Sequence, residues 1–169
     1  YFAVSGTAST AAAGSMYNAA AGLRSKDTAT RLSVGYRVTG MRIGADTSTL
    51  KYTETSAQAN GFQSYTTNTW QVTGEYDLNS QVTLAAQYAN NGAGNCTLNG
   101  TISCSTVGLG GNLVGFGAKY NLDRNFAIFA LAAKGSANSG ASISLGSGAG
   151  RTAIGGTINA VAVGIQARF

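Results

Sequence analysis

The 169-residue chain contains no histidine and no proline, and charged side chains make up only 10% of it. The absence of histidine removes the usual general base and the Ser–His pairing of nucleophilic enzymes. The Gly-rich stretches at residues 108–111 and 146–150 lack the lysine of a phosphate-binding loop. We therefore expect neither enzyme activity nor a cofactor.

Long apolar runs are also missing. No stretch approaches the roughly eighteen consecutive apolar residues of a transmembrane helix, and the mean hydropathy is only +0.03. The chain nevertheless carries too little charge for an ordinary water-exposed surface. Strands hide their hydrophobicity in alternation, because only every second residue meets lipid. If the chain lies in a membrane, we expect it to cross as strands.

The net charge is +5, from 11 Lys and Arg against 6 Asp and Glu. The basic residues are scattered singly and form no run of the kind that tracks a phosphate backbone. A nucleic-acid partner is therefore not expected. The basic balance is compatible with acidic lipid or with a pore that attracts anions.

Only two cysteines are present, Cys96 and Cys104, within a polar stretch that has the composition of a loop. Without histidine or further cysteines, a zinc site has too few ligands. The spacing favours a short disulfide loop over two free thiols. A disulfide indicates an oxidising compartment.

What the chain does contain is regular alternation of apolar and polar residues. In the last nine residues, Val161, Val163, Ile165 and Phe169 share one strand face, while Gln166 and Arg168 share the other. Three earlier hairpins repeat this pattern, at residues 30–46, 70–88 and 113–133. In the third hairpin both faces of residues 126–131 are apolar, and we assign Phe126 and Ile128 to the outer face.

Short turns join the strands within each hairpin, and longer polar stretches at residues 52–62, 90–105 and 135–151 join one hairpin to the next. This arrangement predicts an all-β fold, an antiparallel up-and-down transmembrane β-barrel forming a single domain over residues 1–169. A soluble sandwich would need more charge on its outer faces. Aromatic residues near the short turns are typical of a girdle at lipid headgroup depth: Tyr36, Tyr76, Tyr120, Phe126 and Phe169.

The chain ends in Val-Gly-Ile-Gln-Ala-Arg-Phe, and a strand-end phrase with Gly before Tyr-x-Leu occurs around residues 74–80 and again at 115–125. These features resemble the C-terminal half of the Gram-negative general porins. The resemblance implies a water-filled, trimeric barrel of about sixteen strands in the outer membrane, surrounded by lipid and admitting small hydrophilic solutes. It also implies a membrane-assembly signal at the C-terminus, in which we include Val163, Ile165 and Phe169.

The chain departs from this family in length, because general porins are about twice as long. We count eight strands, or nine if residues 1–10 form one, and a strand there would begin outside the membrane. One solution is that residues 15–169 close alone into a narrow eight-stranded barrel whose lumen is filled by side chains. The other is that the chain is half of a sixteen-stranded porin, whose constriction loop comes from the other half.

Charged residues on the polar strand faces are the candidate pore-lining residues: Arg31, Arg37, Arg42, Asp46 and Glu75. The three arginines gather beside one turn, and a ring of bases raises the local anion concentration in a pore. We therefore expect an anion-preferring porin. Alternatively, the bases pair with Asp46 and Glu75 and have only a structural role in the barrel wall. Other functions left open are a closed barrel acting as an envelope anchor or adhesin, and a secreted β-rich subunit that associates by strand addition.

Overall fold

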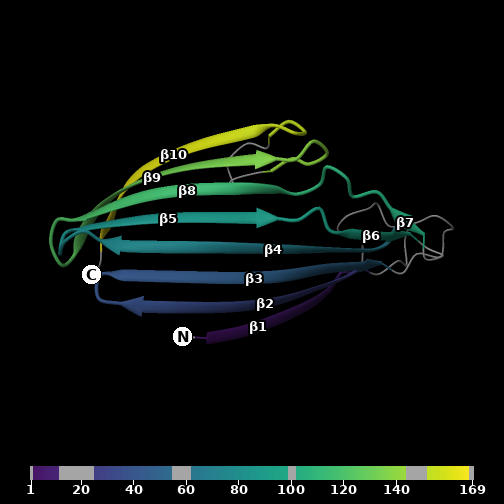
Figure 1. Cartoon of the computed structure of the whole chain (residues 1–169), viewed down its shortest axis with the longest axis horizontal. Helices are drawn as coiled ribbons and strands as arrows, with labels where there is room; N and C mark the ends of the chain where they lie inside the picture. The colour runs from purple at the N-terminus through teal and green to yellow at the C-terminus, as the bar shows by residue number, and fades with distance from the viewer. Residues whose placement is uncertain (1, 12–24, 55–61, 99–101, 144–151, 168–169) are drawn as a thin grey trace.

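The computed structural model describes residues 2–11, 25–54, 62–98, 102–143 and 152–167, and all their regular structure is β. No helix long and apolar enough to span a membrane occurs in these ranges. Figure 1 shows the strands as one sheet. Their bounds are β1 Phe2–Ala11, β2 Ser25–Val38, β3 Met41–Glu54, β4 Phe62–Asp77, β5 Val82–Asn91, β6 Asn95–Leu98, β7 Ser103–Cys104, β8 Gly111–Asn121, β9 Phe126–Ala137 and β10 Thr157–Ala167.

The sheet is an antiparallel meander. Its order is β1-β2-β3-β4-β5-β8-β9-β10, while β6 pairs with the outer part of β4 and with β7. The predicted all-β, up-and-down order is therefore confirmed. In the described residues the sheet is not closed, because β1 and β10 pair with one neighbour each and form its two edges. The short turns lie at one end and the longer connections at the other (Figure 1).

The first strand differs from the expected arrangement. The sequence predicts that residues 1–10, if they form a strand, begin at the loop end and are followed in the sheet by a strand at residues 15–24. Instead β1 pairs directly with β2, from Phe2 opposite Val34 to Ala11 opposite Ser25, so it begins towards the short turns. Residues 15–24 lie outside the described part of the chain. Strand β1 therefore begins, and β10 ends, towards the short-turn end (Figure 1).

Several strands are longer than the alternation alone indicated. Strand β3 continues to Glu54 and β4 begins at Phe62, beyond the hairpins assigned from the sequence. The stretch at residues 90–105, expected to be a loop, contains the small β6–β7 hairpin, which extends the sheet along β4. Polar residues such as Thr66 and Asn95 pair here, because ladder hydrogen bonds join backbone groups whatever the side chains are.

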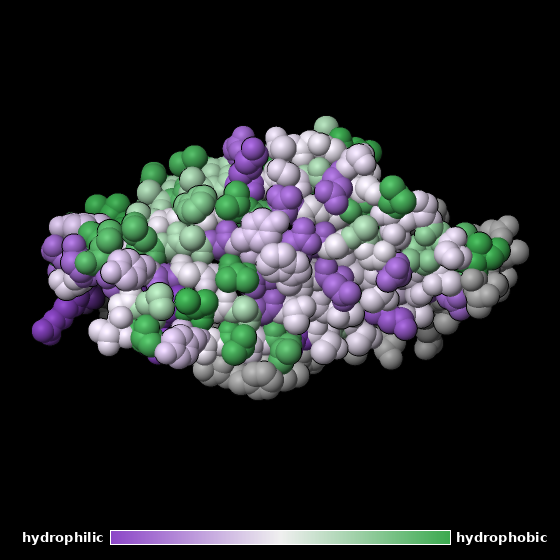
Figure 2. All heavy atoms as spheres, viewed as in Figure 1, coloured by the Kyte–Doolittle hydropathy of each residue, from purple (hydrophilic) through white to green (hydrophobic). Residues whose placement is uncertain are grey.

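Register divides the side chains between two faces. Val34, Ala45, Val72 and Tyr88 lie opposite one another across four strands, so they share a face. The large apolar residues of the strands concentrate there: Leu32, Val34, Tyr36, Val38, Ile43, Trp70, Val72, Tyr76, Leu84, Tyr88, Phe116, Tyr120, Ile128, Val161, Val163 and Ile165, all at least 39% exposed. Figure 2 shows green side chains gathered over the half of the molecule nearer the short turns. We call the face of the sheet that carries these apolar residues the convex face.

The other face is concave. Its side chains line a hollow that reaches from Glu75 on β4 to Gln166 on β10, although these strands are four positions apart in the sheet. Apart from glycines, only Thr67 and Ala127 are buried among residues whose side chains are described. The sheet therefore encloses no ordinary hydrophobic core, and the convex apolar surface needs a cover other than this part of the chain.

The apolar band on the convex face runs obliquely across the strands. On β2 and β4 the band ends, towards the loops, at the polar residues Thr30 and Asn68, which lie at the same level. On β9 and β10 it ends at Lys134 and Asn159, which lie four residues closer to the turns. The boundary moves four residues, or about 13 Å, over six strand spacings of about 4.8 Å, which inclines it by about 25° to the cross-strand direction. The strands are therefore tilted relative to the normal of the surface that the band would contact.

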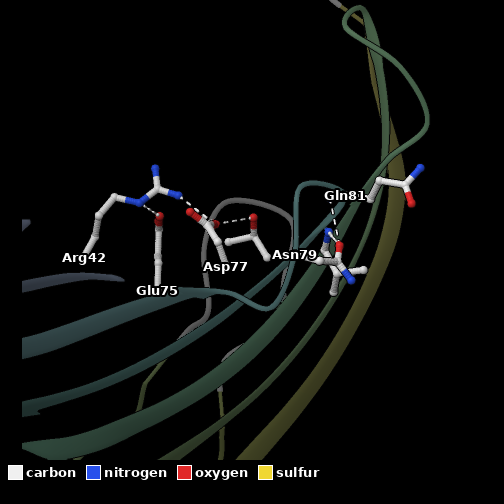
Figure 3. A network of polar contacts seen from close by, with 7 residues as sticks. Arg42, Glu75, Asp77, Asn79 and Gln81 are labelled. Carbon is white, nitrogen blue, oxygen red and sulfur yellow. Dashed lines mark hydrogen bonds and ion pairs between the residues drawn. The ribbon is translucent and has the colours of Figure 1, made fainter. Parts of the chain in front are cut away.

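Two of the short turns are held by the same device. Asn79 Oδ1 accepts hydrogen bonds from the backbone N–H groups of Gln81 and Val82, each at 2.9 Å, after β4 (Figure 3). Asp123 Oδ1 accepts them from Asn125 and Phe126, at 2.7 and 2.8 Å, after β8. Such side chains satisfy backbone donors that the ladder leaves unpaired, which explains why Asn and Asp stand at these positions.

Replacing Asn79 or Asp123 by alanine is expected to destabilise the folded protein by about 1–2 kcal/mol, since each change removes two hydrogen bonds. Urea unfolding in detergent micelles measures the loss. Ser80→Ala is the control in the first turn, because no hydrogen bond of its hydroxyl is present in the described structure. Equal stability of N79A and S80A would mean that the Asn79 bonds are replaced by water without cost.

Candidate functional site

The charged residues predicted to line a pore all lie on the concave face. Register places Arg37, Arg42 and Glu75 side by side across β2, β3 and β4, and places Asp77 opposite Thr83 near the turns. The remaining two, Arg31 and Asp46, lie nearer the loops on β2 and β3. The five predicted residues, Arg31, Arg37, Arg42, Asp46 and Glu75, therefore share one face of the sheet. Whether this face lines a pore is a separate question.

Arg42 connects two carboxylates. Its Nε lies 3.0 Å from Glu75 Oε2, and its Nη2 lies 3.2 Å from Asp77 Oδ1. The Thr83 hydroxyl donates a further hydrogen bond to Asp77 Oδ1, at 2.7 Å. Figure 3 shows this network on the inner side of the curved sheet. One guanidinium thus spans β3 and β4, and Thr83 ties the network to β5.

Asp46 forms a second network. Arg31 Nη2 lies 3.0 Å from Asp46 Oδ1, and the Gln71 amide donates to Asp46 Oδ2 at 2.7 Å. Both carboxylate oxygens therefore have a partner, which keeps the ionised group compatible with its 19% exposed position. The alternative in which Arg31 and Arg42 pair with Asp46 and Glu75 agrees with these distances.

Two cations on this face lack such partners. No ion pair within the described ranges involves Arg37 or Lys119. Arg37 lies directly opposite Arg42, where like charges repel. The two carboxylates on Arg42 reduce this repulsion. Lys119 lies on β8 opposite Thr83, and we did not single it out from the sequence, although the alternation of β8 places it on the polar face.

These ion pairs contribute little to stability. The side chains of Arg31, Arg42 and Glu75 are each 40–52% exposed, and exposed pairs are worth about 0–1 kcal/mol. Their main effect is to hold charges in fixed positions on the concave wall. Within the described residues, no cluster of three or more His, Cys, Asp or Glu could hold a metal ion.

The residues assigned to an assembly signal lie on the convex face. Val163 and Ile165 are 77% and 72% exposed on β10, and they lie opposite Ala130 and Ile128 of β9. Phe169, the third member of this group, lies outside the described residues. The outward assignment of Phe126 and Ile128 is also confirmed, since both share the convex face with Ile165 and Ala167.

The predicted disulfide is present. Cys96 and Cys104 face each other across the β6–β7 ladder, with a Cα–Cα distance of 5.1 Å. The Tyr65 hydroxyl donates to Ala93 O at 3.0 Å, and the Thr106 hydroxyl donates to Gly94 O at 2.9 Å. The Tyr65 bond and the β4–β6 ladder attach the hairpin to the sheet, and the Thr106 bond joins the two segments that flank it. The disulfide therefore stiffens a connection at the loop end, at the opposite end of the strands from the Arg42 network near the turns.

Replacing both cysteines by serine is expected to leave the main sheet folded, because the β4–β5 and β5–β8 ladders do not include residues 95–104. Cleavage by an added protease within the β6–β7 segment should become several-fold faster, since the cross-link no longer restrains it. Strand content by circular dichroism and limited proteolysis measure the two effects. Loss of the strand signal in the double variant would contradict this separation.

Neither a protein-family model nor a curated protein matches this chain. The resemblance to the general porins therefore stays a prediction from the sequence. The geometry of the two faces carries the functional argument.

Proposed function

We propose that this chain forms the wall of an outer-membrane diffusion channel of the general porin type. The channel would pass small hydrophilic solutes with a preference for anions. One observation carries the proposal: a single curved sheet has an apolar convex face and a charged concave face. Lipid would cover the first and water the second, the division found in transmembrane barrels. The proposal requires neither catalysis nor a cofactor.

The size and edges of the apolar band support this proposal. On β5 the band runs from Val82 to Tyr88, which spans about 20 Å, close to the roughly 25 Å lipid-facing band of such barrels. Aromatic residues lie at both of its edges. Tyr76 and Tyr120 lie towards the turns, while Trp70 and Tyr88 lie towards the loops with ring centroids 5.2 Å apart. The inclination of the band by about 25° indicates tilted strands, and it is smaller than the roughly 35–45° tilt of closed barrels.

The proposal imposes a condition on the sheet edges. Backbone N–H and C=O groups cannot remain unpaired in hydrocarbon, yet β1 and β10 each have one unpaired edge in the described residues. In a membrane these edges would pair either with each other or with further strands. The sixteen-stranded, trimeric arrangement of the general porins uses further strands and is part of the proposal.

A preference for anions follows from the charges on the concave face. Four bases stand against three carboxylates among the described side chains of this face: Arg31, Arg37, Arg42 and Lys119 against Asp46, Glu75 and Asp77. The excess is one base, and Arg31 and Arg42 are paired with carboxylates. We therefore propose a weak anion preference, sensitive to salt.

A second candidate is a closed eight-stranded barrel without conductance, acting as an envelope anchor or adhesin. The observation that favours it is the even meander of eight main strands, in which β1 begins and β10 ends towards the short turns. Pairing of β1 with β10 would close such a barrel, and side chains would fill its narrow lumen.

Planar-bilayer recordings distinguish the two candidates. The protein is purified from the outer-membrane fraction, its folding is verified by heat-modifiable migration in gels, and it is added at low concentration in 1 M KCl. Stepwise, long-lived conductance increments are expected of a porin. Folded protein that inserts without any conductance would reject the channel and support the closed barrel. Recovery only from the culture medium would reject both.

A further inference from the structure

The concave face is chemically divided along its length. Charged side chains occupy it on β2 to β4, and Lys119 on β8 is the last of them. Beyond Lys119 the face carries mainly small or apolar residues on β8, β9 and β10, with Gln166 on β10 as a polar exception: Leu113, Gly115, Gly117, Phe129, Leu131, Ala133, Ala160, Ala162 and Gly164. A wall that only conducted water and ions would not need this apolar half.

A hollow of about 630 Å³ lies where the two halves meet. Glu75, Thr83 and Lys119 line its polar side. Phe129 and Leu131 line its other side, where Gln166 is the one polar side chain among the described lining residues. A neighbouring hollow of about 260 Å³ shares Glu75 and Leu131, so the space continues along the strands. Binding sites for small organic molecules have volumes of about 300–1,000 Å³.

The two large apolar side chains lie flat against the sheet. A Cβ atom at position 164 would lie 2.5 Å from Phe129 Cζ, and one at position 117 would lie 2.7 Å from Leu131 Cδ2. Only glycine leaves room for this close approach. Phe129 and Leu131 therefore form a floor below the hollow and do not fill it. Leu131 remains 47% exposed on this floor.

Lys119 supplies the charge beside this floor. Register places it between Thr83 of β5 and Phe129 of β9. The acidic groups nearby, Glu75 and Asp77, are already paired with Arg42. Among the described residues around the hollow, Lys119 is thus a cation without an ion pair, adjacent to exposed apolar surface.

We propose that this hollow binds amphipathic organic anions, in which a carboxylate is joined to an aromatic or branched aliphatic body. The carboxylate would pair with the Lys119 ammonium, and the body would cover Phe129 and Leu131. Such a molecule would make an ion pair and an apolar contact at once. Acetate lacks the apolar body, and an organic cation lacks the negative charge. A role of this site in solute diffusion rests on the proposed function, whereas binding of the anion to the hollow does not.

Saturation-transfer NMR on the folded full chain in micelles tests the site, with phenylacetate as the probe and empty micelles as the blank. Phenylacetate is expected to bind more tightly than acetate or benzylamine. Lys119→Gln should weaken phenylacetate binding about fivefold, the factor that corresponds to one partly exposed ion pair. Lys134→Gln, which removes a charge from the convex face, is the matched control and should change nothing.

Lys119→Arg keeps the positive charge and should retain most of the affinity, which separates loss of charge from loss of fold. Equal binding of phenylacetate by wild type and K119Q, or equal binding of acetate and phenylacetate by wild type, would overturn the proposal. If the protein conducts but fails this test, the proposed channel function stands and the binding site is rejected. If the protein binds phenylacetate through Lys119 but does not conduct, the binding site stands and the channel function is rejected.

Discussion

Replacing Arg31, Arg37 and Arg42 together by glutamine is expected to reverse the ion preference of the channel, from weakly anionic to cationic. The concave face then retains Lys119 against Asp46, Glu75 and Asp77 among its described side chains. Its net charge changes from one excess base to two excess carboxylates. The reversal potential in a tenfold KCl gradient should change sign, because fixed charges set the ion occupancy of a pore.

Salt and a charge-neutral control sharpen this prediction. The preference should be clear near 0.1 M KCl, where the Debye length is about 10 Å, and should fade near 1 M, where it is about 3 Å. The double variant Arg31→Gln with Asp46→Asn removes one ion pair but no net charge, so it should leave the reversal potential unchanged. If the triple variant conducts with an unaltered preference, the three arginines belong only to the structure of the wall.

A single arginine at Val163 is expected to destabilise the membrane-inserted protein by about 2–4 kcal/mol, the cost of a cation near the bilayer midplane. Val163 lies on the convex face of β10 and is 77% exposed. Ala162, its neighbour in the chain, lies on the concave face and is also exposed. Ala162→Arg should therefore cost much less, because its charge would face water.

Urea unfolding from lipid vesicles measures both variants, and heat-modifiable migration reports their assembly. The comparison isolates the face of the strand, since the two positions are adjacent and receive the same side chain. Equal losses at positions 162 and 163 would show that lipid does not cover the convex face. That result would count against every membrane-spanning arrangement of this sheet.

Local sequence was sufficient to predict how residues divide between the two faces. Successive strand residues point to opposite sides, so alternation alone assigned Val34 and Val163 to one face and Arg37 and Glu75 to the other. The short turns within the hairpins at residues 70–88 and 113–133 are also local features, since Asn79 and Asp123 bond to backbone groups two and three residues away. The Cys96–Cys104 pair was predictable because only two cysteines exist.

The details of the charged site depended on longer-range geometry. Alternation placed Arg42 and Glu75 on one face, but it did not show that Arg42 binds Asp77 as well, or that Arg37 and Lys119 lie without ion pairs in the described part of the chain. These outcomes depend on register between strands and on side-chain reach, since partners 33 to 35 residues apart meet only after the sheet has formed.

By itself, the sequence determined the β character of the chain, the inward and outward sides of its main strands and the disulfide, because each depends on residues close together in the chain. Tertiary structure decided that residues 2–11 pair with β2, that the described sheet has two free edges, and that β4 and β10 line one hollow. Pairing partners and curvature result from the summed twist and register of all strands, and no local pattern encodes that sum.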